Sequence, residues 1–235
     1  ICVGGSKGAF IVDQKHGTVN HIGESMGLKG REVRCFKEDN EGKIWMGTYG
    51  GGLYCYHKNK LTNINEIKNS CLDKDVFCIA EDTFGYYYIT SNHGLWRLNI
   101  KALNEFYYGR LNHLIPFHYN EESGILNAEF NGGFQNNYLR TKSGHFYFPT
   151  LQGIVVTTPE EPISRKLKPI INQIIINDTL ADLNIHTLEK ETYSVQFKFS
   201  CVNFSNKLNI YYQYKLKGSD NEEWSSLQKS TIINF

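Results

Sequence analysis

A segment rich in glycine and aromatic residues recurs along this chain and limits the folds that it can adopt. Glu38–Tyr56 reads EDNEGKIWMGTYGGGLYCY, and Ala80–Leu98 reads AEDTFGYYYITSNHGLWRL. Both segments run from an acidic pair through a glycine turn into an aromatic burst, then through a second glycine into another burst. The turn glycines Gly42 and Gly85 lie 43 residues apart. That period is typical of four-stranded repeat units, so the repeat predicts an all-β array.

Two weaker copies extend the array in both directions. Thr141–Val156 carries the equivalent glycines Gly144 and Gly153, and the first residues, from Ile1 through Phe10, also follow the pattern. The repeat units are therefore expected at about residues 1–30, 31–73, 74–118 and 119–162. The distance from Gly85 to Gly144 is longer than one period, and the extra residues begin with Lys101–Gly109, expected as a short helix or an irregular excursion.

Each unit is expected to fold into four short antiparallel strands, which makes it a β-propeller blade. Alternation of polar and apolar residues predicts the first strand, and glycine-containing turns reverse the chain into the next ones. The recurring acidic pairs fit hydrogen-bonded turn chemistry. The positions expected to define the repeated structure are Gly42, Trp45, Gly47, Gly52, Gly85, Gly94, Trp96, Gly144 and Gly153.

The composition changes after a proline-containing charged linker at Thr157–Pro169. Beyond the linker, the glycine loops stop and alternating strands predict a small β-sandwich at residues 163–235. Tyr212 and Tyr214 are expected in its core, with Trp224 packing against the core edge. On this count the sandwich would still need one or two strands, so we expect the chain to be a piece of something longer.

Composition and charge argue against several classes of function. The chain has 25 Lys and Arg against 24 Asp and Glu, so it lacks the basic surplus that nucleic-acid binding needs. The six cysteines show no CxxC spacing, so neither a metal site nor a cofactor is expected. No apolar run is long enough to cross a bilayer.

The loops between the second and third strands of each blade are the best candidates for ligand contact, because they share a face with the blade-to-blade connections. On that face, Tyr49, Asn92 and His93 offer an aromatic ring, an amide and an imidazole. We weigh this site against the alternative that the three residues are ordinary solvated loop residues. Trp45, Tyr88, Trp96 and Tyr147 are expected to pack between blades instead.

The repeat resembles the two-component regulator propeller repeat, and Glu122–Glu161 resembles the last blade of such propellers. Ile210–Trp224, IYYQYKLKGSDNEEW, is similar to the three-tyrosine domain that follows the propeller in that family. The resemblance implies the final blades of a seven-bladed propeller followed by an immunoglobulin- or fibronectin-like sandwich, truncated at both ends. It further implies a periplasmic sensor of a hybrid two-component regulator, which responds to oligosaccharides and controls polysaccharide-utilisation genes.

The same resemblance implies a homodimer formed through the sandwich and a membrane helix outside this sequence. Kinase and DNA-binding segments are absent from it, so this part is expected to be non-enzymatic. Two alternatives stay open: a stand-alone glycan-binding propeller, and a propeller lyase. A lyase would need a histidine–acid cluster near the propeller axis, and His57, His93, His113 and His118 do not recur at one blade position.

Overall fold

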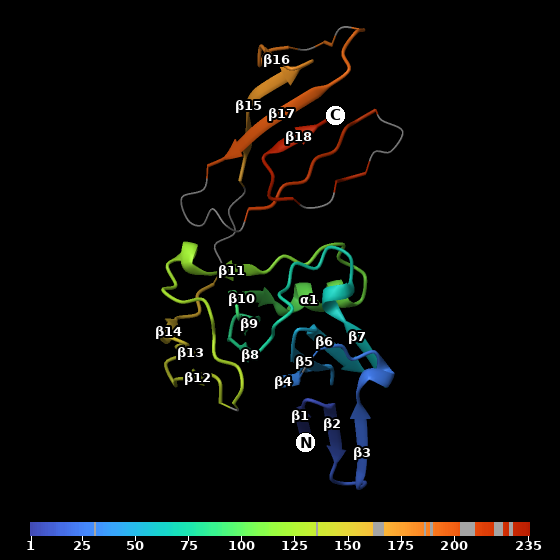
Figure 1. Ribbon diagram of the computed structural model, residues 1–235, viewed down its shortest axis with the longest axis vertical. Coiled ribbons are helices and arrows are strands. Elements are labelled where there is room, and N and C mark those ends of the chain that lie inside the picture. Colours follow the sequence, from blue (N-terminus) through green and yellow to red (C-terminus); the bar gives the residue numbers. More distant parts are fainter. Residues whose placement is uncertain are drawn as a thin grey trace. The chain divides into compact units, whose positions relative to one another are not determined.

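The computed structural model divides into two compact units, residues 1–161 and 162–235. It describes residues 1–30, 32–134, 136–161, 167–185, 187–188, 190–202, 210–218, 223–225 and 228–235. The first unit contains four antiparallel sheets that follow one another along the chain (Figure 1). The all-β prediction is confirmed, although the sheets do not close into a ring among the described residues.

Blade 2 is a complete four-stranded blade, as the repeat predicts. Its strands pair in sequence order: β4 (Glu32–Glu38), β5 (Ile44–Tyr49), β6 (Gly52–His57) and β7 (Lys60–Asn63). The turn between β4 and β5 is built on Asp39, whose Oδ1 accepts hydrogen bonds from the backbone N–H groups of Glu41 (2.9 Å) and Lys43 (3.0 Å). Gly42 has a φ of 73° there, a conformation that glycine adopts without steric cost.

Blade 3 repeats this plan with one insertion. Its strands are β8 (Cys78–Glu81), β9 (Tyr86–Ser91), β10 (Gly94–Asn99) and β11 (Phe117–Tyr119). Asp82 replaces Asp39, and its Oδ1 accepts from the N–H groups of Phe84 (2.8 Å) and Tyr86 (2.9 Å). The insertion contains helix α1 (Ile100–Tyr107), whose start is capped by the Asn99 side chain. The excursion expected at Lys101–Gly109 is therefore helical.

Blades 1 and 4 each show three strands. Blade 1 pairs β1 (Cys2–Gly5), β2 (Gly8–Asp13) and β3 (Thr18–Ile22), while blade 4 pairs β12 (Leu139–Arg140), β13 (Phe146–Thr150) and β14 (Gly153–Thr157). Short 3-10 turns, η1 (Glu24–Met26), η2 (Ile64–Glu66) and η3 (Glu121–Ser123), lie in the connections. Among the described residues, no helix is long and apolar enough to cross a membrane.

The hydrophobic cores lie between blades, because each sheet has two apolar faces to cover. The largest buried cluster joins blades 2 and 3 and includes Trp45, Ile89 and Leu103 of α1. A second cluster joins blades 3 and 4 around Tyr88, Phe146 and Phe148. Burying one such side chain stabilises the fold by about 2–3 kcal/mol. The predicted inter-blade packing thus holds for Trp45 and Tyr88, whereas Trp96 and Tyr147 are only partly buried.

None of the six cysteines forms a disulfide bond. Burial raises the pKa of Cys35 and of Cys55 to about 12. Both thiols therefore stay protonated near neutral pH and serve as small apolar groups.

The second unit contains one sheet among its described residues, in the order β16 (Thr179–Ala181), β15 (Pro169–Ile176), β17 (Val195–Cys201) and β18 (Ile232–Asn234). A turn at Asn177–Asp178 joins β15 to β16, and both residues have positive φ, as a tight hairpin requires. Among the described residues of 210–218, Tyr212 forms one isolated bridge, with Gln228.

The predicted core residues of this unit divide into two groups. Tyr212 packs edge-on against Phe199 with ring centroids 4.7 Å apart, and Tyr214 packs against Phe235 at 5.5 Å. Trp224, in contrast, is 65% exposed, so its expected place at the core edge is wrong. The chain turns at Lys217–Gly218, which lies between Tyr214 and Trp224 in the sequence.

Candidate functional site

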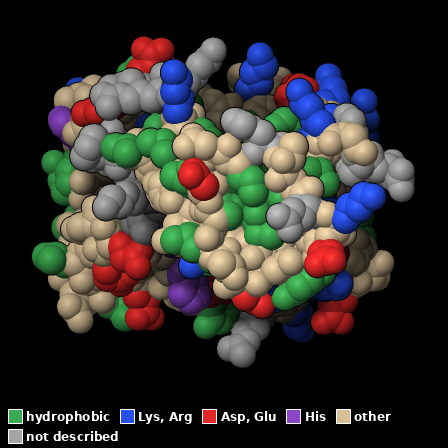
Figure 2. All heavy atoms as spheres, turned by 90° about the horizontal axis from the view of Figure 1, so that it is seen from above, with side chains coloured by type: hydrophobic (Ala, Val, Ile, Leu, Met, Phe, Trp, Pro, Cys, Tyr) green, Lys and Arg blue, Asp and Glu red, His purple; other side chains and the backbone are tan. Residues whose placement is uncertain are grey.

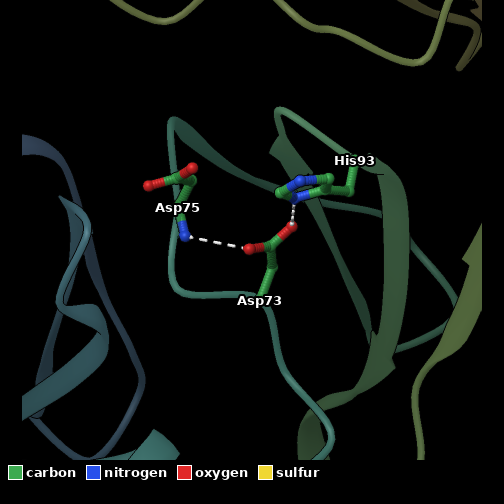
Figure 3. A group of neighbouring side chains, drawn as sticks. All are labelled: Asp73, Asp75 and His93. Atoms are coloured by element: carbon green, nitrogen blue, oxygen red, sulfur yellow. Dashed lines mark hydrogen bonds and ion pairs between the residues drawn. The ribbon is translucent and has the colours of Figure 1, made fainter.

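Three segments that are distant in sequence meet on one face of the first unit. They are the β5–β6 loop (49–52), the connection from blade 2 to blade 3 (71–76) and the β9–β10 loop (91–94). We call the surface formed by these three segments the crossover face. Figure 3 shows Asp73, Asp75 and His93 at its centre. This is the face on which the sequence predicted ligand contact.

Asp75 binds both neighbouring loops. Its Oδ1 accepts a hydrogen bond from the backbone N–H of Gly50 (2.8 Å), and its Oδ2 accepts one from the side-chain amide of Asn92 (2.7 Å). One carboxylate therefore links blade 2 to blade 3. Hydrogen bonds to an ionised acceptor are stronger than neutral ones, which makes this a firm connection.

Asp73 holds the imidazole of His93. His93 Nδ1 lies 2.8 Å from Asp73 Oδ2, while Asp73 Oδ1 accepts from the backbone N–H of Asp75 at 3.2 Å (Figure 3). The Asp73 side chain is 10% exposed and that of His93 is 70% exposed. The hydrogen bond to Asp73 raises the pKa of His93, because the carboxylate stabilises the imidazolium.

Asp73, Asp75 and His93 are also the described residues best arranged to hold a metal ion, since their potential ligand atoms all lie within 4.8 Å of one another. Each carboxylate oxygen already accepts a hydrogen bond from the protein, however. A metal ion would have to replace the contact between His93 and Asp73. These hydrogen bonds link the loops of blades 2 and 3 to the segment that connects the two blades. The expected absence of a metal stays a prediction.

The three predicted ligand residues do not form one surface. Asn92 and His93 direct their polar groups to Asp75 and Asp73. The Tyr49 ring lies against Phe77 instead, with centroids 6.0 Å apart, and the Arg34 guanidinium is 5.6 Å from the Tyr49 ring centroid. The backbone of Tyr49 thus belongs to the crossover face, but its ring packs against Phe77 and against Arg34 of β4.

Sequence reasoning missed the two aspartates that organise the crossover face. The only signal was the pair of acidic residues in CLDKDV, inside a segment expected to be a plain connection. It also missed two grooves of the first unit. One, of about 510 Å³, lies beside β14 and includes Tyr88 and Arg97, and the other, of about 520 Å³, lies along β4.

Comparison with known proteins decides the nature of the repeat. Residues 27–50, which include β4 and β5, match the family described as Two component regulator propeller. This part of blade 2 is similar to a two component regulator propeller repeat. The match confirms the resemblance of the repeat that the sequence suggested.

The propeller-containing chain is similar over most of its length to much longer proteins. It is 23% identical over 204 residues to Histidine kinase P4 of Formosa agariphila, a match that covers 80% of this chain and 14% of that protein. Among solved structures, it is similar to the extracellular domain of BT3049, named as a hybrid two component system of B. thetaiotaomicron. That match has a TM-score of 0.58 and 15% identity, and covers all of this chain and 33% of the other.

A second extracellular domain from B. thetaiotaomicron, BT4673, matches with a TM-score of 0.42 and 14% identity over 97% of this chain and 30% of the other. The sequence thus spans about a third of the solved domains and a seventh of the kinase. At these identities, the BT3049 match shows a shared fold, which extends through both units of this chain.

Proposed function

We propose that this chain is part of the extracellular domain of a hybrid two-component sensor histidine kinase. The observation that carries the proposal is a propeller repeat of the two-component regulator type, followed by a second β unit, in a chain that shares its fold from end to end with one such extracellular domain. The similarity to a histidine kinase points in the same direction. In this function the chain senses and relays, and a catalytic domain elsewhere in the protein transfers phosphate.

The signal in this proposal is an oligosaccharide, met in the periplasm, and the response is the expression of polysaccharide-utilisation genes. Binding can drive such a response only if the ligand has different affinities for two arrangements of the protein. Small shifts between blades, which meet at packed cores and at the crossover face, provide those arrangements.

A homodimer formed through the second unit would carry the shift to the membrane. Several large apolar side chains of this unit are exposed, and a partner in a homodimer would cover them. They are Ile170, Ile171, Leu180, Leu183, Leu188 and Val202. Hydrophobic side chains also reach the surface in the space-filling view (Figure 2).

The proposal is tested on the full-length protein in lipid vesicles, by measuring autophosphorylation while a panel of oligosaccharides is added on the extracellular side. We expect at least one oligosaccharide class to change the rate. A response to none of them would contradict the proposal. Chromatography of the added sugars in the same samples tests the lyase alternative, since only a lyase shortens them.

A further inference from the structure

Blade 4 has no outer strand among its described residues. Its sheet runs in the order β12, β13, β14, so β14 (Gly153–Thr157) is a sheet edge (Figure 1). In blades 2 and 3 the third strands, β6 and β10, are each covered by a fourth, β7 and β11. A glycine begins each third strand, at Gly52, Gly94 and Gly153. Thus β14 corresponds to β6 and β10, but its outer side is unpaired.

The edge of β14 offers backbone groups for pairing. Pro149 has no N–H and lies opposite Ile154 in the β13–β14 register, so these two residues form a pair of the non-hydrogen-bonded type. Because the two pair types alternate, Ile154 and Val156 direct their N–H and C=O groups away from β13. The strand has no charged residue, proline or bulge, the features that protect exposed edges in natural proteins. This edge is therefore suited to accept another strand.

A groove of about 510 Å³ lies beside this edge, and its lining includes Val155 of β14 and Tyr119 of blade 3. In blade 3, the outer strand places His118 opposite Trp96, and their rings stack with centroids 3.8 Å apart. In blade 2, Leu61 of the outer strand packs against a buried cluster shared with blade 1. Outer strands therefore send side chains toward the preceding blade. In blade 4, the groove is the space that such side chains would fill.

The residues that directly follow β14 do not supply the fourth strand. Thr158 Oγ1 lies 2.7 Å from His145 Nδ1, and the backbone carbonyl of Glu160 accepts a hydrogen bond from Arg97 Nη2 (2.5 Å). Since Arg97 belongs to β10, the chain crosses to blade 3 instead of turning back along β14. A fourth strand must therefore come from a segment that is distant in the sequence or from another molecule.

A distant segment of the same molecule is the favoured source. This sequence spans about a third of the solved domain whose fold it shares, so a protein of that kind contains many further segments. A segment tethered in the same molecule has an effective concentration of about a millimolar, far above that of a second molecule in dilute solution.

We propose that the edge of β14 accepts a β-strand from a distant segment of the same full-length protein, and that this strand completes blade 4. The segment is uncharged and extended, with an apolar residue opposite Val155 that fills the groove. A second apolar residue lies opposite Ile154, as Tyr119 lies opposite Leu95 in blade 3. Three or four residues are sufficient, the lengths of β11 and β7. The inference concerns assembly and does not depend on the sensor function.

The test is hydrogen exchange of the full-length protein in detergent, followed by mass spectrometry at single-residue resolution. The amides of Ile154 and Val156 should exchange as slowly, within about tenfold, as those of Leu95 and Arg97, which pair with β11. Exchange at the rate of unprotected amides would overturn the inference. Protection that falls on dilution would also overturn it, because the strand would then come from a second copy. A kinase that ignores every oligosaccharide would leave the expected result unchanged.

Two variants of Val156 test whether its N–H is paired. Val156→Pro removes this N–H without removing a hydrogen bond to β13, whereas Val156→Ala shortens the side chain and keeps the N–H. Val156→Pro should speed exchange at Ile154 about tenfold or more, and Val156→Ala should speed it much less. Unchanged exchange at Leu95 and Arg97 is the control that blade 3 stays folded. Equal rates at Ile154 in the two variants would overturn the inference.

Discussion

Blades 2 and 3 follow one plan but satisfy the same buried carboxylate in different ways. In blade 2, Asp39 Oδ2 accepts from the indole N–H of Trp45 (3.0 Å) and lies 3.2 Å from the fully buried Lys43 Nζ. In blade 3, the equivalent Asp82 Oδ2 faces Arg97 Nη2 at 3.4 Å, from the neighbouring strand β10. Both blades have the same aspartate turn, but the cation beside the aspartate is Lys43 in one and Arg97 in the other. The two copies therefore share the need to pair a buried carboxylate, and they meet it with different side chains.

The cations differ in how much they depend on that carboxylate. Burial disfavours the charge of Lys43, yet hydrogen bonds to Glu41 and Asp39 raise its pKa, so it stays charged. Arg97 has further partners, because it donates to the backbone carbonyl of Glu160 and lies 4.2 Å from the centre of the Tyr86 ring. Lys43 likewise has a second partner in Glu41, but Asp39 Oδ2 also accepts from the Trp45 indole N–H, so blade 2 relies more heavily on its aspartate.

The largest effect is expected from removing the two aspartates separately. Asp39→Ala should lower the free energy of unfolding by about 3–5 kcal/mol, because it removes the acceptor of the buried Trp45 indole N–H as well as one partner of a buried cation. Asp82→Ala should cost about 2 kcal/mol, since Arg97 keeps its other contacts. Urea denaturation measures both values, and Asp13→Ala, in an exposed turn, is the control. A larger loss for Asp82→Ala would contradict the comparison.

A second test exchanges equivalent residues on β5 and β9. Gly47 in blade 2 corresponds to Thr90 in blade 3, and a Cβ at Gly47 would overlap Cys35 Sγ and Val76. Gly47→Thr should therefore cost about 1–3 kcal/mol through overpacking. Thr90→Gly should cost about 1 kcal/mol, because its buried hydroxyl has no partner among the described residues. Thermal unfolding measures both costs. A smaller cost for Gly47→Thr than for Thr90→Gly would contradict this comparison.

Tyr108, which directly follows helix α1, contacts the acidic turn of blade 2 from blade 3. The Tyr108 hydroxyl donates to Glu41 Oε2 (2.8 Å), and Lys43 Nζ lies 5.3 Å from the centre of its ring. Tyr108→Phe should lower the free energy of unfolding by about 0.5–1 kcal/mol. The same change in an Asp39→Ala background should have a different effect, because both residues act on Lys43. Strict additivity in this double-mutant cycle would show that the two contacts are independent.

The smallest effect is expected at the crossover face, and it depends on pH. The pKa of His93 in the folded chain is raised above the ordinary value of about 6.5 by its hydrogen bond to Asp73. The pair is therefore fully stabilising below that ordinary value and is lost as pH rises through the folded pKa. The pair is exposed, so we expect a contribution of at most about 1 kcal/mol. The stability difference between the unchanged chain and His93→Ala should shrink from pH 5.5 to pH 8.5, and a difference that grows would contradict this assignment.

The sequence predicted the elements of the first unit better than its site. Strands, turns and the excursion at Lys101–Gly109 follow from local patterns, namely alternation, glycine position and capping by Asn99. The links made by Asp73 and Asp75 join residues from 17 to 25 positions apart, and no local pattern encodes such contacts. For the same reason, the neighbours of Tyr49 and the exposed position of Trp224 became visible only in three dimensions.

The three tryptophans occupy three different surroundings, which gives this molecule built-in optical reporters. Trp45 is fully buried between blades, Trp96 is stacked on His118 with ring centroids 3.8 Å apart, and Trp224 in the second unit is largely exposed. A buried indole emits at shorter wavelength than one in water, and a protonated imidazole quenches an indole stacked against it. The fluorescence of Trp45 therefore reports loosening of the blades, that of Trp96 reports its stacking on His118, and that of Trp224 reports any partner that covers the second unit.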